Sequence, residues 1–226
     1  MKRIFPAIIL ALACAAPAAA ETRALTGFTT VSAADRVSVE IVTGGAYAVE
    51  VTGADAARIR TRLDGAALRI SDANRPWFGE APRLDAHIRI SAPELRAIVA
   101  SRGAGIEAAI NGACAQLDVA ASMGGQANVT AAACGAVDAT ASMGGDVRLD
   151  GACQTLSASA SMGGLVRAEA LRCATVDASA SMGGDVQAFA SRSYQARASM
   201  GGAVNVAGAA ATRERSSTLG GSVIDR

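Results

Sequence analysis

Large aromatic side chains are scarce in this sequence of 226 residues, which contains four phenylalanines, two tyrosines and one tryptophan. About half of the residues are nevertheless apolar (51%), and much of that fraction is alanine. Protein interiors are close-packed, so a chain with so few bulky side chains cannot fill the wide core of an ordinary globular domain. The composition therefore favours an architecture whose interior is narrow and whose layers lie close together.

Lysine and histidine are almost absent, since Lys2 is the only lysine and His87 the only histidine. Loss of residues 1–20 would remove Lys2 and Arg3, so the 21 basic residues would fall to 19 against 20 acidic ones, a net charge near −1. Such a chain lacks the basic surface that binds nucleic acid, and we expect no nucleic-acid partner.

A long hydrophobic run is also lacking. The apolar stretch at residues 4–13 is shorter than the roughly 20 apolar residues of a membrane-spanning helix, so we expect no transmembrane segment. Two basic residues precede it and three alanines at 18–20 follow, a pattern typical of a secretory signal peptide over 1–20. The mature protein is expected to be exported, to the periplasm or outside the cell. A lipoprotein attached through Cys14 is the less favoured alternative, because Leu12 lies one place away from the usual lipobox position.

What the chain has instead is a repeat. The motif Ser-Met-Gly-Gly occurs at 122–125, 142–145, 161–164, 181–184 and 199–202, and a degenerate copy, Ser-Thr-Leu-Gly-Gly, occupies 217–221. Successive copies begin 20, 19, 20, 18 and 18 residues apart, a period typical of solenoids, in which each repeat is one coil stacked on the last. Glycine adopts backbone angles that side chains forbid, so each pair is a predicted corner. The corner glycines are Gly124, Gly125, Gly144, Gly145, Gly163, Gly164, Gly183, Gly184, Gly201 and Gly202.

Short alternating stretches flank each corner, and two such strands per coil are what a β-solenoid needs. We therefore predict an all-β fold over 93–226, a parallel β-helix with about 19–20 residues per coil. Side chains alternate between the two faces of a strand, so aligned polar residues of one parity are expected to face solvent. This row contains Asp118, Asp138, Ser157, Asp177 and Gln195.

Residues 21–92 are rich in predicted strands but do not repeat, and we assign 21–226 to a single domain. Alternation predicts strands at 36–42 and 47–52, and Asp64-Gly65 predicts a tight hairpin turn between strands at 58–63 and 67–71. A loop follows that contains Arg75, Trp77 and Phe78. We expect it to be the lid of the coil stack, because aromatic side chains bury large areas, or else a ligand site.

Several short stretches follow one another along the chain in a characteristic order. The stretches are Phe-Thr-Thr-Val at 28–31, Val-Ser-Val-Glu-Ile at 37–41, Tyr-Ala-Val-Glu-Val at 47–51, His-Ile-Arg-Ile at 87–90, Pro-Glu-Leu at 93–95 and Ser-Arg-Gly-Ala-Gly at 101–105. Together they resemble the bacterial family called "putative auto-transporter adhesin head GIN domain", over nearly all of the mature chain. The resemblance implies a right-handed parallel β-helix secreted by bacteria, and it supplies no catalytic residues. The family's recurring Ser-Gly-Ala-Gly-Asp is altered here, since methionine replaces the first glycine and the aspartate survives only as Asp146 and Asp185.

The corner methionines form a row that ends in Leu219, namely Met123, Met143, Met162, Met182 and Met200. A row of thioethers could bind a metal or sense oxidants. Leucine keeps the volume but lacks the sulfur, so we expect the row to fill a corner of the core.

Other candidate sites are also weak. No coil contains a histidine that could act as a base for the aligned serines, so hydroxyls bonded along the row are favoured over nucleophiles. The glycine pairs resemble the calcium-binding β-roll only faintly, because its nine-residue period is missing. We expect no catalytic residue, metal or cofactor, and none at His87 either.

Four cysteines, Cys114, Cys134, Cys153 and Cys173, each lie eight residues before a repeat serine. They therefore occupy one position in four consecutive coils. Neighbouring coils are about 4.8 Å apart, which lies within the Cα range of a disulfide. In an exported protein we expect the pairs Cys114 with Cys134 and Cys153 with Cys173, in preference to four stacked thiols.

The last copy of the repeat changes character. With the series aligned on Ser217, the positions of Leu117 and Val119 in the first full coil are taken by Thr212 and Glu214. Charge on a terminal coil discourages further stacking, so 212–216 is a predicted polar cap.

Two function classes follow from this reading. The favoured one is a nonenzymatic, exported module of the cell envelope or surface that binds or adheres through a coil face, with an envelope glycan or a surface protein as partner. The alternative is a carbohydrate-active enzyme on a β-helix scaffold, for which the row of aspartates would supply acids. The even coils favour the first class, because an enzyme site generally interrupts a repeat with a longer loop.

Overall fold

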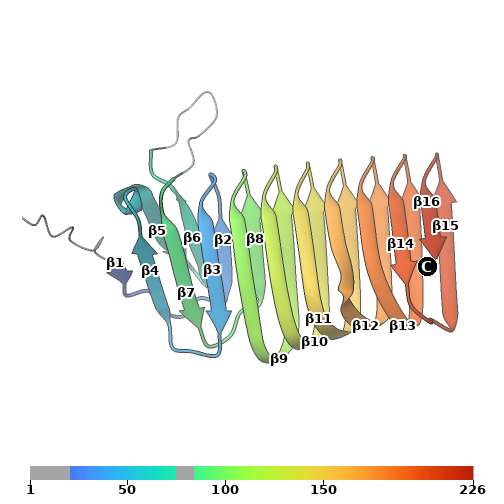
Figure 1. Cartoon of the computed structure of the whole chain (residues 1–226), viewed down its shortest axis with the longest axis horizontal. Coiled ribbons are helices and arrows are strands. Elements are labelled where there is room, and N and C mark those ends of the chain that lie inside the picture. Colours follow the sequence, from blue (N-terminus) through green and yellow to red (C-terminus); the bar gives the residue numbers. More distant parts are fainter. Residues whose placement is uncertain (1–20, 75–83, 226) are drawn as a thin grey trace, which may run out of the picture.

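The protein forms one elongated stack of β-strands in a computed structural model that describes residues 21–74 and 84–225 (Figure 1). The strands before the repeats are β1 (Glu21–Arg23), β2 (Thr30–Ala33), β3 (Ser38–Thr43), β4 (Ala48–Thr52), β5 (Ile59–Asp64), β6 (Ala67–Asp72), β7 (His87–Ala92) and β8 (Ala97–Ser101), with a 3-10 helix, η1 (Ala56–Arg58). The repeats contain β9 (Gly105–Ser122), β10 (Gln126–Ser142), β11 (Asp146–Ser161), β12 (Leu165–Ser181), β13 (Asp185–Ser199), β14 (Ala203–Ala207), β15 (Thr212–Thr218) and β16 (Ser222–Asp225). The predicted β-solenoid is confirmed.

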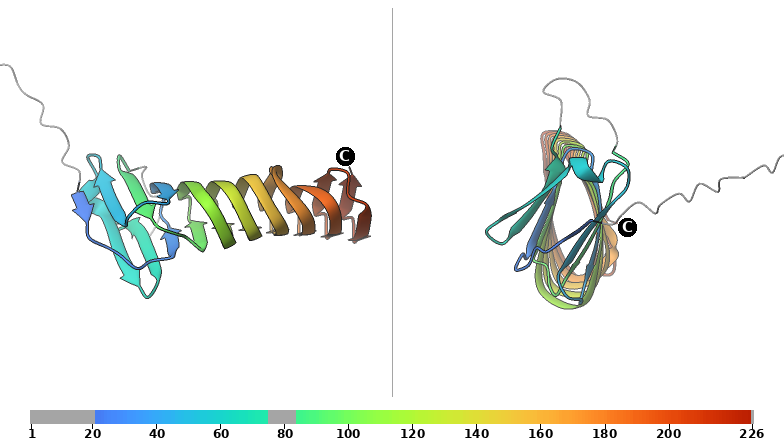
Figure 2. Two further views of the ribbon diagram at one scale, coloured as in Figure 1. Left: turned by 90° about the horizontal axis from the view of Figure 1, so that it is seen from below. Right: turned by 90° about the vertical axis from the view of Figure 1, so that its left-hand side faces the viewer.

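Each long strand from β9 to β13 makes most of one coil. It runs along one side of the stack, bends, and returns along the other side to a tight turn, so that an end-on view shows a flattened oval (Figure 2). Neighbouring coils pair in parallel and in register on both sides of the bend, as β10 does with β9 and β11, and the register shifts at the bend itself. The two short strands predicted for each coil are therefore the two halves of one bent strand.

Rows of small apolar residues fill the space between the two sides of the oval. The row beside the tight turns is alanine in five successive coils, from Ala121 to Ala198, and is fully buried. Farther from the turns, where the sides diverge, the matching row is larger: Leu117, Val137, Leu156, Val176 and Tyr194. The abundance of alanine thus reflects a core only two side chains thick.

The tight turns need their two glycines for different reasons. In the second full turn, the Gly145 amide donates to the Ser142 carbonyl oxygen at 2.9 Å, while Met143 and Gly144 have φ of 48° and 72°. Positive φ at both central residues is the pattern of a type I′ turn, which glycine adopts without strain. A Cβ on Gly144 would meet open space, whereas one on Gly145 would lie 2.3 Å from the Ala121 carbonyl oxygen of the preceding coil. The second glycine lets one coil cross closely over the last.

The strands before the repeats continue the stack in an order that differs from their order in the chain. The pair β2 and β3 forms a coil between two others, because β2 pairs in parallel with both β6 and β8, and β3 with both β7 and β9. Antiparallel strands β5, β4 and β1 then close this end. The predicted hairpin around Asp64-Gly65 is confirmed as the β5–β6 pair.

Bulkier residues pack this N-terminal end. Phe28 is fully buried and its ring meets that of Tyr47 edge to face, with centroids 5.0 Å apart. At the edge of the stack, Arg58 of η1 donates to the buried carboxylate of Asp72 at 2.7 Å. The predicted lid residues Arg75, Trp77 and Phe78 lie outside the residues that the structure describes.

The last coil corrects the alignment on Ser217. Thr218, and not Ser217, lies opposite Ser199, so the inward positions opposite Tyr194 and Ala196 belong to Arg213 and Arg215. Thr212 and Glu214 are therefore not at core positions. Thr218 takes the place of the repeat serine, so the last repeat is one residue longer than the spacing of serines indicated.

A polar cluster closes this end of the core. Asp225 of β16 accepts hydrogen bonds from the Tyr194 hydroxyl and, at 3.0 Å, from Arg215, and it lies 3.4 Å from Arg213. The Tyr194 bond and the two guanidinium groups hold the pKa of Asp225 below its usual value, while burial and the bond to Asp225 raise the pKa of Tyr194. Because β15 and β16 lie on opposite sides of the oval, the cluster bridges them, and the predicted charged cap consists of inward-facing arginines.

We expect Gly145→Ala to lower the melting temperature more than Gly144→Ala. Gly144→Ala costs only the strain of a side chain at positive φ, about 1–2 kcal/mol. Gly145→Ala instead forces the backbones of two neighbouring coils apart. Each kcal/mol corresponds to about 2–4 °C in a chain of this size. Circular dichroism melts of the two single variants make the comparison, and equal losses would contradict the assigned role of the second glycine.

A variant that gives the last coil the residues of an inner one, Arg213→Leu, Glu214→Asp and Arg215→Val together, is expected to form concentration-dependent oligomers. It removes the inward charges and presents apolar side chains at the open end of the stack. Sedimentation velocity over a range of concentrations measures the effect, with Glu214→Asp alone as the control. A triple variant as monodisperse as the parent would show that these arginines do not stop the stacking.

Candidate binding surface

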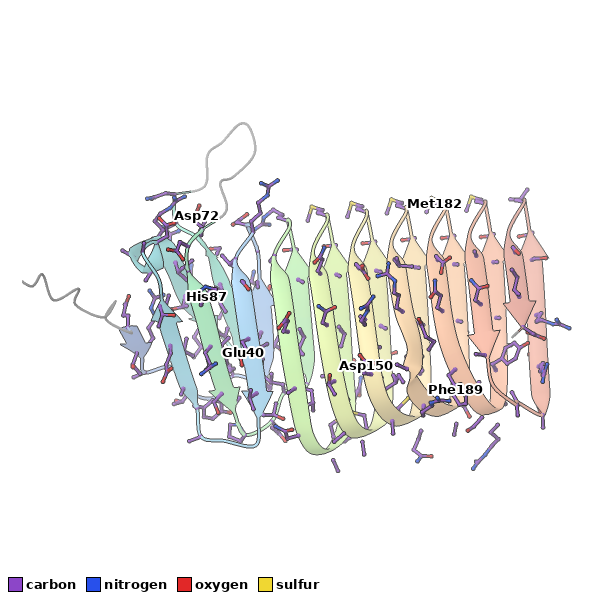
Figure 3. All side chains as sticks on the ribbon, viewed as in Figure 1. Glu40, Asp72, His87, Asp150, Met182 and Phe189 are labelled. Atoms are coloured by element: carbon purple, nitrogen blue, oxygen red, sulfur yellow. A yellow bond between two sulfur atoms is a disulfide. The ribbon has the colours of Figure 1, made fainter. Side chains whose placement is uncertain are left out.

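Charged side chains gather on the outer surface of the sheet formed by β4, β7, β3 and the first halves of β9 and β10, which we call the front face. Glu50, Arg89, Glu40 and Glu107 lie side by side in that order, one on each successive strand from β4 to β9. Their neighbours in each strand point into the core, so alternation turns these four side chains toward solvent. Figure 3 shows Glu40 and His87 on this face.

Two adjoining hollows mark the front face. The first, of about 370 Å³, is lined by Ser38, Val39, Glu40, Glu50, Thr52, His87, Ile88, Arg89 and Glu107. The second, of about 310 Å³, extends over β10 to Asn128, Thr130 and Asp150. Glu40 and Glu107 line both hollows, and they therefore lie at the centre of a polar surface that crosses several strands.

The charges on this surface are free to meet a ligand. Arg89 donates to Glu40 through Nη2 at 3.0 Å and Nε at 3.2 Å, but both side chains are more than half exposed. Ion pairs this exposed contribute little to stability, so the pair is not needed for folding. Three carboxylates against one guanidinium leave the row negative, and its acceptors suit hydroxyl or cationic groups.

The adjacent carboxylates raise the question of catalysis. Glu40 and Glu107 lie opposite each other on paired strands, and a pair of neighbouring carboxyl groups is the catalytic arrangement of most glycosidases. The acid of such a pair is generally desolvated by apolar neighbours. Here both side chains are exposed on an open surface, an arrangement better suited to hydrogen bonding than to proton transfer.

The opposite outer surface, the back face, carries the row predicted from the repeats. Asp118, Asp138, Ser157, Asp177 and Gln195 lie in register on successive coils and point away from the core. Asp177 accepts from Arg197 at 3.0 Å. Two hydroxyl contacts between coils, from Ser179 to Ser159 at 3.3 Å and from Ser193 to Thr175 at 3.4 Å, lie in other rows and not among the repeat serines.

The prediction that methionines fill a corner of the core is wrong. Met123, Met143, Met162, Met182 and Met200 are 46–50% exposed, and Leu219 is 78% exposed. Their sulfurs lie along the outer edge of the turns, where Met182 is labelled in Figure 3. The first central residue of a type I′ turn projects away from the strands that the turn connects, and the corner itself is filled by the alanine row.

Two disulfides join successive coils near the bend. The structure pairs Cys114 with Cys134 and Cys153 with Cys173, and the Cα atoms of each pair are 4.6 Å apart. These are the expected pairs. All four cysteines stack in one row, because Cys134 also lies opposite Cys153.

Two kinds of feature are absent from the described residues. Within residues 21–74 and 84–225, no group of three or more histidine, cysteine, aspartate or glutamate side chains could hold a metal ion. The same part of the chain contains no helix that is long and apolar enough to cross a bilayer.

Comparisons with known proteins agree with this geometry. A family model described as "Putative auto-transporter adhesin, head GIN domain" matches residues 27–210. The chain belongs to this family. No curated protein matches the sequence of this head GIN domain.

Solved structures share the fold of the head GIN domain. A protein from Bacteroides fragilis described as a putative adhesin has a TM-score of 0.79 at 20% identity, over 92% of this chain and 96% of that one. A protein from Parabacteroides distasonis described as a putative lipid binding protein has a TM-score of 0.66 at 12% identity, over 94% and 98%. A putative adhesin from Parabacteroides merdae has a TM-score of 0.56 at 13% identity, over 94% and 97%. At these identities the likeness shows the fold alone.

Sequence reasoning missed the front face as a unit. Alternation around Glu40 and Arg89 does place each of them outward, but β3 and β4 are consecutive in the chain and have β7 between them in the sheet. Nothing in the local pattern shows this insertion, so the row from Glu50 to Glu107 could not be assembled from the sequence.

The head GIN domain purified from an oxidising compartment is expected to contain no free thiol among its mature cysteines. Peptide mapping without reduction should recover Cys114 linked to Cys134 and Cys153 linked to Cys173. Recovery of four thiols, or of a Cys134–Cys153 link, would contradict the pairing. Replacing Cys153 and Cys173 together by alanine, the residue that follows them in the row at Ala190, should destabilise the fold by about 2–4 kcal/mol.

Proposed function

We propose that this head GIN domain is an exported, nonenzymatic binding or adhesion module of the cell envelope or surface, and that its front face binds an envelope glycan. The family and the disulfides support the general class, because disulfides persist in oxidising compartments. The choice of face rests on one observation, the two adjoining hollows that share Glu40 and Glu107.

The chemistry of the front face supports a hydroxyl-rich ligand. Ionised carboxylates accept charge-assisted hydrogen bonds from hydroxyl groups, and Arg89 can donate to sugar oxygens. The row extends across four strands in register, so it offers repeated acceptors to an extended chain in place of one enclosed pocket. An extended polymer gains affinity by meeting several weak subsites at once.

The alternative, a carbohydrate-active enzyme, is favoured by one feature only, the juxtaposition of Glu40 and Glu107. In that case Glu40 would exchange its Arg89 partner for a substrate oxygen. The binding module and the enzyme therefore depend on the same two side chains, Glu40 and Glu107. One set of variants, tested for both binding and hydrolysis, distinguishes the two functions.

The test compares two matched pairs of substitutions in the mature protein. Glu40→Gln with Glu107→Gln removes the front-face carboxylates, and Asp118→Asn with Asp138→Asn removes an equivalent pair from adjacent strands of the back face. Binding to isolated envelope glycans is measured by calorimetry or on a glycan array. We expect the first pair to weaken binding by at least about tenfold, since a hydrogen bond to a charged group contributes about 1.5–3 kcal/mol, and the second pair to leave it unchanged.

Three results would count against the proposal. Loss of binding in the back-face variant alone would show that the site lies on the other surface. Equal binding by all variants would show that the front-face carboxylates take no part in binding. If the protein released reducing ends from the glycan, and the front-face substitutions abolished that release, the protein would be an enzyme and not a binding module.

A further inference from the structure

The methionines of the mature chain share one structural position. The sequence has six methionines, and those other than Met1 are the five at the outer edge of the tight turns. The serine before each methionine and the two glycines after it are the same in all five coils, whereas the residue after the glycine pair varies, as Gln126, Asp146, Leu165, Asp185 or Ala203. Methionine thus occupies the first central position of the turn in five successive coils.

Neither the turn nor the core requires methionine there. The five residues have φ between 47° and 49°, a region that costs an ordinary side chain about 1–2 kcal/mol. Type I′ turns favour asparagine, aspartate or glycine at this place. Half-exposed side chains also gain little from burial. What methionine adds over the favoured turn residues is a flexible thioether.

Backbone hydrogen bonds align the methionines of neighbouring coils in a row. The amides of Gly124, Gly144, Gly163 and Gly183 each donate to the carbonyl oxygen of the methionine in the next coil, at 3.2–3.3 Å. Aligned Cα atoms of neighbouring coils lie 4.6 Å apart at both disulfides. Two flexible thioether side chains that leave neighbouring coils at this spacing can bind one metal ion between them.

We propose that the methionine row, Met123, Met143, Met162, Met182 and Met200, binds the soft monovalent cations copper(I) and silver(I), each ion held by the thioethers of two neighbouring coils. Thioether sulfur is a soft ligand that prefers copper(I) to hard cations such as magnesium or calcium. A thioether cannot be consumed by disulfide formation, as the four cysteines of this protein are. The only histidine, His87, lies on the front face of β7, several strands away along the stack.

Pairwise binding along a row of five predicts a count that depends on position. Five sulfurs hold two ions, because two pairs use four of them. Met162→Leu leaves two intact pairs, 123 with 143 and 182 with 200, so two ions remain. Met143→Leu isolates Met123 and leaves three adjacent sulfurs, which hold one ion. The two variants have the same composition, and leucine already occupies the equivalent turn at Leu219.

The experiment titrates the mature, disulfide-bonded protein with silver(I) in chloride-free buffer, followed by native mass spectrometry and by the methionine methyl signals in NMR. We expect two ions in the parent, two in Met162→Leu and one in Met143→Leu, with unchanged melting temperatures. The control with all five methionines replaced by leucine should lose both ions. Equal counts in the two single variants, silver retained by the fivefold variant, or no binding by the parent would each overturn the proposal.

Discussion

The in-register backbone ladder between coils is the interaction on which the rest of the structure depends. Each tight turn must pass directly over the carbonyl of the preceding coil, and the missing Cβ of Gly145 and its equivalents makes that approach possible. Once the coils are in register, every position in the repeat becomes a row. The alanine core, the stacked cysteines, the methionine edge and the solvent-facing aspartates are all consequences of the same alignment.

The front and back faces show how two different surfaces arise on one scaffold. The back face repeats its pattern, with Asp118, Asp138 and Asp177 in one row. The front face combines strands β4, β7 and β3 from before the repeats with the first halves of β9 and β10, and it mixes both signs of charge with His87 and hydroxyl groups. A repeating surface suits contacts that are uniform along the stack, whereas a mixed one can distinguish partners, which is why we place the specific site there.

The sequence predicted the features that depend on position within a repeat and missed those that depend on long-range pairing. The solenoid, the outward aspartates and the cysteine pairs all follow from spacing. The methionine row was misjudged because volume and polarity alone placed it in the core, although the first central residue of a two-residue turn has no core to reach. The inward Arg213 and Arg215 were missed because serine spacing shifted the last coil by one residue. The row through Glu40 needed the insertion of β7 between β3 and β4, which no local pattern records.

The placement of β2 and β3 beside the first repeat also limits the order in which the chain can fold. Within the repeats, partners are close in sequence, as when Gln126 pairs with Asp146, so each coil can add to the last by local contacts. The coil formed by β2 and β3 is different, because its partners lie far along the chain. Thr30 pairs with Ala97, and Ser38 pairs with Gly105. Closing such long loops is slow compared with adding local contacts. The N-terminal strands can pair among themselves, as β5 does with β6 and β3 with β7, but the edges of β2 and β3 that face the repeats stay open until β8 and β9 arrive. Open strand edges can pair with other chains, so these edges are the part of the folding chain most exposed to misassembly.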